Sequence, residues 1–384
     1  MNRTIHCGAA AAAVLLTASA LAACGGSSSS GGSAGAAHAK KLSFQLTDSG
    51  CTPNSATVDA GPVTIVATNP GTSKTDELEL KNGDGIILGE RENLAPGLSG
   101  DFTLTLQPGR YVVDCTFQNE DRRGGTLTVT GSAVASKGAS AAKLAAGVAA
   151  YKAYVQRQSG ELLTQTQAFV AALEAGDVQR AKALFGPARS HYEAIEPIAE
   201  SFGDLDPEID ARANDVPAKD FKGFHRIEQQ LWVDGNTAGM TPFDDELLAN
   251  VKKLQSLIPT IKLEPAQIAN GAVELMNEVA TSKITGEEDR YSHTDLWDFE
   301  ANDAGAIAAF KAVRPIVAAK NPTLADTIDR QFASTEAELA RYKTAAGGFE
   351  LYTALTTTQT RALAAQVEAL ADSLAKAPPI IVAG

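Results

Sequence analysis

A histidine and a glutamate three residues apart are the strongest candidates for metal chemistry in this sequence. His225 and Glu228 lie in Gly-Phe-His-Arg-Ile-Glu, and on a helix their side chains share one face. Phe224, Leu231 and Trp232 lie on much the same face, which we therefore expect to be buried. A buried carboxylate beside an imidazole is costly unless something compensates it. Either a metal ion or a plain His–Glu hydrogen bond would do so, and the spacing alone leaves both open.

A second pair of carboxylates, Glu193 and Glu196, has the same spacing within Arg-Ser-His-Tyr-Glu-Ala-Ile-Glu-Pro (189–197). One cation could bridge both carboxylates, and hard cations such as Fe³⁺ prefer carboxylate oxygen. The alternative is a solvated stripe in which Arg189 and these acids pair along the helix surface. Pro197 lacks a backbone donor, so it predicts a kink beside Glu196.

Two more acidic segments could contribute ligands. The run Asp-Leu-Asp-Pro-Glu-Ile-Asp (204–210) ends in Asp210, and one of its acids could face the glutamate pair. It is not a calcium loop, because Ile209 stands where an EF-hand needs glycine. The segment 286–299 clusters acids around His293 in a predicted loop that leads into a helix, with a serine or threonine beside His293 as the N-cap.

Two domains of opposite character must position these residues. From Leu42 to Thr130, apolar residues alternate with polar ones between turn signals, which predicts an antiparallel β-sandwich of roughly seven strands. Residues 131–139 are a small-residue linker, and 140–384 has the helical period of an all-α bundle, with an extended tail from Pro378. Helices are expected near 140–174, 177–202, 218–233, 243–258, 264–284, 302–319, 322–345 and 349–376.

The N-terminal segment predicts export. Residues 1–23 carry one basic residue, Arg3, followed by an apolar run of the length found in signal peptides. The run ends in Leu-Ala-Ala-Cys-Gly, which resembles the bacterial lipobox and makes Cys24 the predicted lipidation site. The alternative is a plain signal peptide with a chance cysteine. Residues 24–40, rich in glycine and serine, form a predicted tether that places the domains outside the cytoplasmic membrane.

The composition narrows the function classes. The 384 residues hold 33 Lys and Arg against 46 Asp and Glu, a formal net charge of −13. Nucleic-acid binding normally requires a basic face, so no nucleic-acid partner is expected. The 4 cysteines are too few for a disulfide-built scaffold. With only 5 histidines, a metal site must draw mainly on carboxylates.

Three helical-domain segments carry a family resemblance: ARSHYEAIEPIAESFGDLDPEIDAR (188–212), GFHRIEQQLW (223–232) and YSHTDLWDFEAN (291–302). Together with the sandwich and lipobox, they resemble the EfeO-type iron-uptake lipoproteins, which pair a cupredoxin-like domain with an imelysin, or peptidase-like, helical domain. The resemblance places the family's His-x-x-Glu motif on His225 and Glu228. Its other metal-site acids fall on Glu193, Glu196, Asp210 and one of Glu287 or Glu288.

The resemblance implies capture of ferrous or ferric iron outside the membrane and delivery to a membrane permease, alongside a haem-containing dye-decolourising-type peroxidase. The ligand types would also accept Zn²⁺. An enzyme remains the competing hypothesis, either a zinc-dependent imelysin-type metallopeptidase with Glu228 as base or a ferroxidase. The absence of His-Glu-x-x-His from the sequence argues against proteolysis.

The sandwich departs from blue copper proteins. Pro-Gly-Arg-Tyr-Val-Val-Asp-Cys (108–115) resembles the strand that leads to the copper cysteine in cupredoxins, but a type 1 site needs two histidines beside that cysteine. No histidine or methionine occurs between Leu42 and Thr130, which excludes type 1 copper. In an exported domain, Cys51 and Cys115 most simply form a disulfide. The alternative, which the resemblance implies, is a copper or iron site of these cysteines with acids such as Glu77 and Glu79.

Overall fold

A computed structural model of the chain describes residues 39–116, 124–134 and 138–383. The described residues fall within one compact unit, Ala36–Gly384. The predicted signal peptide, Cys24 and nearly all of the predicted tether lie outside the described residues. Among the helices of the described part, none is long and apolar enough to cross a membrane.

The first domain is a sandwich of two sheets. A 4-stranded sheet has the order β2-β1-β4-β7, and a 5-stranded sheet has the order β3-β9-β8-β5-β6. The period of two is clearest in β4, where Val63, Ile65 and Ala67 are buried and the residues between them are half-buried. The strands are β1 (Lys40–Thr47), β2 (Gly50–Thr52), β3 (Ser55–Asp59), β4 (Gly61–Thr68), β5 (Leu78–Lys81), β6 (Ile87–Arg91), β7 (Ser99–Leu106), β8 (Gly109–Asp114) and β9 (Gly125–Thr130).

Most strand pairs are antiparallel, as the turn-rich sequence predicts, but β1–β4 and β3–β9 run parallel. Each parallel pair joins strands that are not consecutive along the chain, so no tight turn between them marks the pairing in the sequence. The predicted β-sandwich followed by a helical bundle is confirmed, but the described part of the sandwich has 9 strands rather than the predicted seven, and its sheets are mixed rather than antiparallel.

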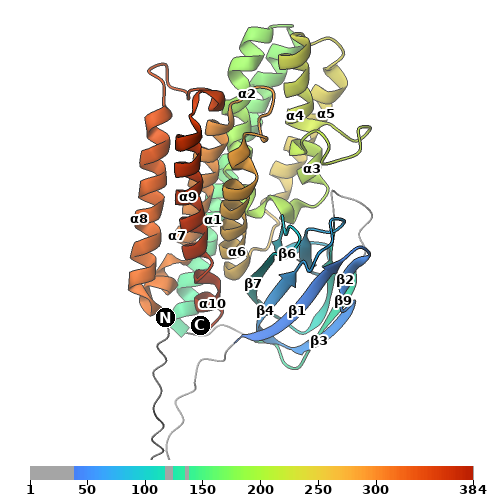
Figure 1. Ribbon diagram of the computed structural model, residues 1–384, viewed down its shortest axis with the longest axis vertical. Coiled ribbons are helices and arrows are strands. Elements are labelled where there is room, and N and C mark those ends of the chain that lie inside the picture. Colours follow the sequence, from blue (N-terminus) through green and yellow to red (C-terminus); the bar gives the residue numbers. More distant parts are fainter. Residues whose placement is uncertain (1–38, 117–123, 135–137, 384) are drawn as a thin grey trace, which may run out of the picture. The chain divides into compact units, whose positions relative to one another are not determined.

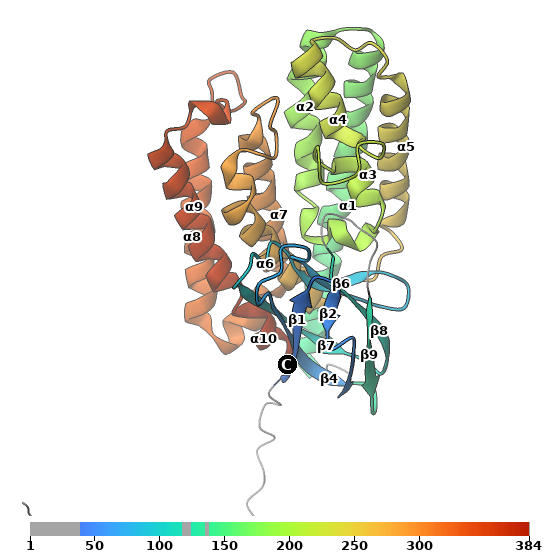
Figure 2. The same ribbon diagram turned by 45° about the vertical axis from the view of Figure 1, so that its right-hand side comes forward.

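The second domain is helical, and α8 and α9 lie side by side in it (Figures 1 and 2). The α-helices are α1 (Gly138–Glu174), α2 (Val178–Glu193), α3 (Leu205–Asp210), α4 (Gly223–Gln229), α5 (Thr241–Leu257), α6 (Pro265–Thr281), α7 (Asp295–Lys320), α8 (Pro322–Leu339), α9 (Thr357–Leu374) and α10 (Ala377–Val382). Short 3₁₀ turns are η1 (Glu196–Phe202), η3 (Lys283–Thr285), η4 (Ala340–Tyr342) and η5 (Tyr352–Ala354), and η2 (Gln230–Asp234) is a π-helix.

Several helix boundaries differ from the sequence prediction: the helix predicted from 218 begins at Gly223, and the helix predicted from 349 begins at Thr357. The predicted helix 177–202 is interrupted at Ala194, where α2 ends and the chain continues as η1 beside Pro197. Helix α7 begins at Asp295, two turns before the predicted start, with Thr294 at the N-cap position. The prediction of an extended tail is wrong: residues 377–382 form α10, because Pro378 sits in the first turn, where a missing N–H costs nothing.

Helix α6 packs directly on the sandwich. The Asn270 side chain donates to the Thr103 carbonyl at 3.0 Å, and that of Gln267 donates to the Ile87 carbonyl at 2.8 Å. Glu274 pairs with Arg91. Each of these contacts gives a partner to a polar group that would otherwise lose its hydrogen bonds to water on burial.

Cys51 of β2 and Cys115, which follows β8, are joined by a disulfide with a Cα–Cα distance of 5.6 Å. The bond closes a loop with a sequence separation of 64 residues. Sulfur in a disulfide is not a thiolate ligand, so the mixed cysteine–carboxylate site is not formed in this arrangement. Of the residues in that alternative site, only the carboxylates Glu77 and Glu79 could still bind a metal ion.

We expect the Cys51→Ser/Cys115→Ser variant to lose about 2–4 kcal/mol of unfolding free energy, because the disulfide restricts the unfolded chain. Urea denaturation measures this loss. Thiol titration of the two unfolded proteins without reductant should give equal thiol counts, because Cys51 and Cys115 contribute none. Two extra thiols in the wild type would contradict the disulfide.

Candidate metal centre

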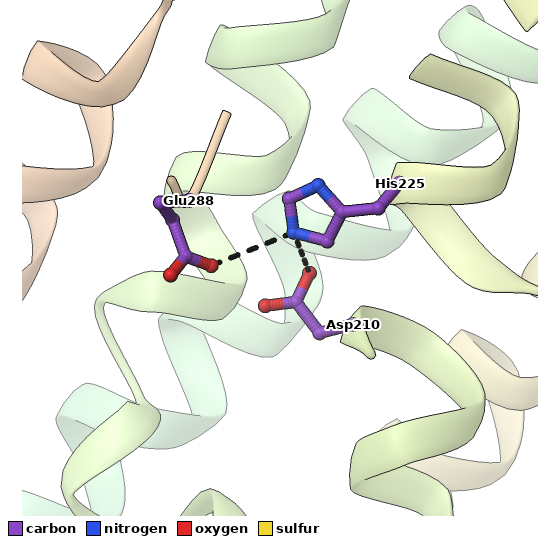
Figure 3. Close-up of side chains that lie close together, drawn as sticks. All are labelled: Asp210, His225 and Glu288. Atoms are coloured by element: carbon purple, nitrogen blue, oxygen red, sulfur yellow. Dashed lines mark ion pairs between the residues drawn. The ribbon is translucent and has the colours of Figure 1, made fainter. Parts of the chain in front are cut away.

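His225 lies on α4 with its side chain 1% exposed, and its two ring nitrogens face different acids. Nε2 lies 3.7 Å from an Asp210 oxygen and 3.5 Å from a Glu288 oxygen, as Figure 3 shows. Nδ1 lies 3.0 Å from Glu228 and 4.0 Å from Asp289. His225 therefore belongs to two groups of three residues that could each hold a metal ion: one with Asp210 and Glu288, the other with Glu228 and Asp289. In each group, one potential ligand atom from every residue lies within 4.8 Å of the others.

The two nitrogens differ in one decisive respect. Nδ1 is hydrogen-bonded to Glu228, whereas Nε2 is buried with no hydrogen-bond partner. A buried polar atom without a partner is costly, and a bound ion or an ordered water is a common way of satisfying one. In Figure 3 the carboxyl groups of Asp210 and Glu288 both point toward Nε2. Imidazole nitrogen with carboxylate oxygen is a donor set that suits iron or zinc.

The start of α4 brings His225 against Asp210. Gly223 has a φ of 77°, and a Cβ built there would lie 2.2 Å from the Ile209 carbonyl oxygen. Only glycine permits both that backbone conformation and that approach. The last turn of α3, which ends in Asp210, can therefore touch the first turn of α4, which carries His225.

Glu228 ties α4 to the loop before α7. One of its oxygens is hydrogen-bonded to His225, and the other accepts from the backbone N–H groups of Tyr291 at 3.0 Å and Ser292 at 2.7 Å. Burial would raise the pKa of Glu228, but the bonds to His225 and Ser292 outweigh it and lower that pKa. Glu228 thus fixes the imidazole ring and the loop that carries Glu288 and Asp289, and both of its oxygens are occupied.

A buried arginine shares the carboxylates of the centre. Arg189 is 0% exposed and donates two hydrogen bonds to Asp210, at 2.9 and 2.7 Å. Its guanidinium also pairs with Glu288, lies 2.6 Å from Glu193 and lies 2.8 Å from Asp298. These carboxylates raise the pKa of Arg189 despite its burial, so it remains a cation.

The glutamate pair of the sequence analysis is bridged by a side chain of the protein. The Lys283 ammonium lies 2.9 Å from Glu193 and 2.6 Å from Glu196, and the Asn302 amide donates to both. The alternative of a solvated stripe is wrong for Arg189 and Glu193, since both are 0% exposed. The buried position explains why the pair needs a cation, and Lys283 supplies it.

The charges of the site shift its pKa values in opposite directions. Burial and Arg189 act to lower the pKa of His225, but Glu228, Glu288 and Asp210 outweigh them and raise it to about 10. Burial raises the pKa of Asp210 to about 7 against the opposing effect of Arg189. The pKa of Glu288 lies well below its usual value because Lys283, Arg212 and Arg189 outweigh burial. The centre is therefore built from buried ion pairs.

A cavity of about 330 Å³ leads to the centre. Its lining includes Asp210 and Glu288, and most of the other lining side chains are polar or acidic. Some of these, Asp76, Glu77, Glu79 and Glu92, belong to the sandwich, and the others include Glu196, Asp206, Asp215, Glu278 and Glu287. The negative lining favours the entry of a cation.

The structure leaves four candidate ligands outside the metal-compatible groups of the described residues: Glu193 and Glu196, which Lys283 bridges, and Glu287 and His293. Glu287 lies on the cavity wall, with an oxygen 3.9 Å from Arg212. His293 takes a left-handed backbone conformation with φ 58°, and it belongs to none of the metal-compatible groups of the described residues.

Asp289 and Asp298 are not singled out by the sequence within the segment 286–299, and Arg189 is considered there only as part of the alternative solvated stripe. Asp298 and Asn302 lie on one face of the first turns of α7, four residues apart, and both face the buried carboxylates. The predicted helix begins at residue 302, so Asp298 and Asn302 are not predicted to be neighbours on one helix face. Nothing in the sequence near Lys283 marks it as the partner of Glu193, because the two are 90 residues apart.

In the sandwich, Glu77, Glu79 and Glu90 bring one oxygen each to within 4.8 Å of one another. Glu79 pairs with Lys81, whose ammonium lies 3.3 Å from Asp114. Burial and Glu79 raise the pKa of Glu77 to about 8. Such an oxygen-only set favours hard cations over copper.

Known proteins share both domains. Residues 147–377 match the imelysin family model, and residues 8–129 match that of the cupredoxin-like domain. The iron uptake system component EfeO of Escherichia coli O157:H7 is 43% identical over 349 residues, which cover 89% of this chain and 92% of that protein. This chain belongs to the EfeO family. EfeO of Escherichia coli K12 is 42% identical over the same shares of both chains.

Membership of the EfeO family confirms the resemblance drawn from the three helical-domain segments. Among solved structures, reduced auracyanin from Roseiflexus castenholzii aligns over 25% of this chain and 100% of its own, at 19% identity. Its TM-score of 0.21 is too low to bear on the fold.

We expect Gly223→Ala to disrupt the centre, because the new Cβ would push α4 away from the Ile209 carbonyl and separate His225 from Asp210. Gly235→Ala is the matched control: its φ is 67°, but a Cβ there meets nothing within 4 Å. Both variants carry a left-handed alanine, which costs about 1–2 kcal/mol. Calorimetric titration with Fe²⁺ under anaerobic conditions should show weakened binding in Gly223→Ala only. Equal binding by both variants would contradict this role of Gly223.

Proposed function

We propose that this chain binds iron for uptake, at a centre formed by the Nε2 atom of His225 with Asp210 and Glu288. The observation that supports the proposal most directly is the buried Nε2 atom, which lacks a hydrogen-bond partner and lies 3.5–3.7 Å from the carboxyl groups of Glu288 and Asp210. The relatives' name, iron uptake system component, supports iron as the metal. The donor set would also take Zn²⁺, so zinc is the competing metal to measure.

Glu228 acts in this proposal as the residue that orients His225. A metal-binding histidine usually gives its other ring nitrogen to a carboxylate, which fixes the ring and strengthens the ligand. Glu228 meets that description through its 3.0 Å contact with Nδ1. A peptidase would need this glutamate as a general base, but its two oxygens are already engaged and its pKa is lowered. Binding therefore accounts for Glu228 better than catalysis does.

The proposal extends to location and partners. The predicted signal peptide and the lipobox at Cys24 support a chain held by lipid at the outer face of the cytoplasmic membrane. Iron released from the centre would pass to a membrane permease, and a haem-containing dye-decolourising-type peroxidase would work beside it. In the sandwich, the trio of Glu77, Glu79 and Glu90 would form a second, weaker site for a hard cation such as iron.

We expect His225→Ala to weaken Fe²⁺ binding by at least about tenfold, and Glu228→Gln to weaken it by roughly 10- to 100-fold through the misplaced ring. Anaerobic calorimetry with Fe²⁺ and then Zn²⁺ measures both. His191→Ala is the control, since His191 is half-buried and bonded to Gln158 rather than to the centre. Iron binding by His225→Ala equal to that of the wild type would refute the assignment.

We expect Arg189→Gln to lose about 3–5 kcal/mol of stability without metal, because it leaves buried carboxylates without their cation. Iron should restore much of that loss, so the rise in melting temperature on adding Fe²⁺ should exceed that of the wild type. Arg314→Gln, which breaks only more exposed pairs with Asp326 and Asp329, should cost about 1 kcal/mol or less and leave the iron effect unchanged. A smaller iron effect in Arg189→Gln would mean that Arg189 assists binding.

A further inference from the structure

A second cavity, of about 460 Å³, opens between α1, α2, α7 and α8. It shares no lining residue with the cavity that leads to the metal centre. Its volume lies in the range typical of sites for small molecules. Its lining includes Trp297, Glu300, Asp303, Glu336, Leu339 and Lys343.

The wall of this cavity contains a carboxyl group that the protein does not satisfy. Asp303 is 2% exposed, and its Oδ1 atom has no hydrogen-bond partner. Burial, with the nearby charges of Glu336 and Glu300, raises the pKa of Asp303 to about 8. The one cation on the wall in the described structure, Lys343, pairs with Glu300. The Oδ1 atom of this buried carboxyl group therefore has neither a hydrogen-bond donor nor a compensating positive charge among the described lining residues.

The rest of the lining indicates what kind of cation would fit. Ala194, Ala301 and Leu339 give apolar surface, and the Trp297 ring stands at 78° to Phe349 with 5.6 Å between centroids. An aromatic face attracts a cation, and apolar surface packs against the alkyl part of an organic one. Asp303 belongs to none of the metal-compatible groups among the described residues, so a bare metal ion would find too few ligands.

We propose that this cavity binds a small organic primary ammonium ion, which donates a hydrogen bond to Asp303 and packs its alkyl chain against Trp297 and the apolar wall. The primary ammonium is preferred over a quaternary one because the unpartnered Oδ1 atom needs an N–H donor. Glu336, which is exposed at the rim and lies near Asp303, would attract the cation or a second ammonium group. The site is separate from the iron centre and does not depend on the proposed iron function.

Calorimetric titration of the full chain with putrescine tests the proposal. The wild type should bind with a saturable one-site isotherm, and Asp303→Asn should weaken binding by at least about tenfold, as expected when a hydrogen bond to a charged group is lost. Asp372→Asn makes the same change at an exposed position on α9 and should bind as the wild type does. His225→Ala should also bind putrescine normally.

Two further probes and one control sharpen the outcome. Tetramethylammonium, which has no N–H, and 1,4-butanediol, which has no charge, should both bind at least about tenfold more weakly than putrescine. Asp303→Asn should remain folded, since it keeps the shape and removes a buried acid. Because burial raises the pKa of Asp303 to about 8, well above the ordinary value of an aspartate, this group lowers the free energy of unfolding as pH rises through that range. Urea denaturation at several pH values should show this decrease in the wild type and not in Asp303→Asn.

Several results would overturn the proposal. One is putrescine binding by Asp303→Asn as tight as that of the wild type. Another is the absence of saturable binding to the wild type. Loss of binding in His225→Ala would place the ammonium ion at the metal centre instead. Tetramethylammonium binding as tight as that of putrescine would exclude the hydrogen bond to Asp303.

Discussion

The structure of the helical domain depends on how it compensates carboxylates that it buries together. Glu193, Glu228 and Asp298 are each 0% exposed, and a buried charge without a partner would cost several kcal/mol. Two buried cations, Arg189 and Lys283, lie among these acids and hold α2, η1, α3 and the loop before α7 in one place. The cluster is thus both the source of the site's chemistry and a condition for folding, so ligand positions and helix positions cannot change independently.

Close backbone contacts make that compensation geometrically attainable. Gly223 lets α4 approach the end of α3, which brings the imidazole to Asp210. Gly271 does the same for α6, since a Cβ there would lie 1.8 Å from the Pro197 carbonyl. Helix α6 therefore lies directly on η1, and the turn that follows it delivers Lys283 to Glu193 and Glu196. Gly223 and Gly271 thus allow the close backbone contacts that bring the charged side chains together.

Local spacing explains which parts of the site the sequence could predict. His225 and Glu228 are three residues apart on one helix, so their contact follows from helix geometry alone. The partnership of Lys283 with Glu193 depends on how distant helices pack, which periodicity does not encode. The burial of Arg189 could not be predicted for the same reason. The i, i+4 spacing of Arg189 and Glu193 is the same whether the pair lies on a solvated or on a buried face of the helix. In the sandwich, alternation predicted the strands, whereas the parallel pairings needed the tertiary structure.

The internal cations also bear on how a transport protein could release its cargo. An arriving metal ion does not enter an empty set of charges, because Arg189 already donates to Asp210 and His225 has a pKa near 10. If the centre takes iron as proposed, binding would be an exchange in which a proton leaves the imidazole and the guanidinium gives up some of its hydrogen bonds to the carboxylates. The free energy of binding would then be smaller than that of carboxylates with no internal cation to compensate them. A centre built in this way can select its ion through ligand type and still give the ion up, because the protein supplies the replacement charges itself.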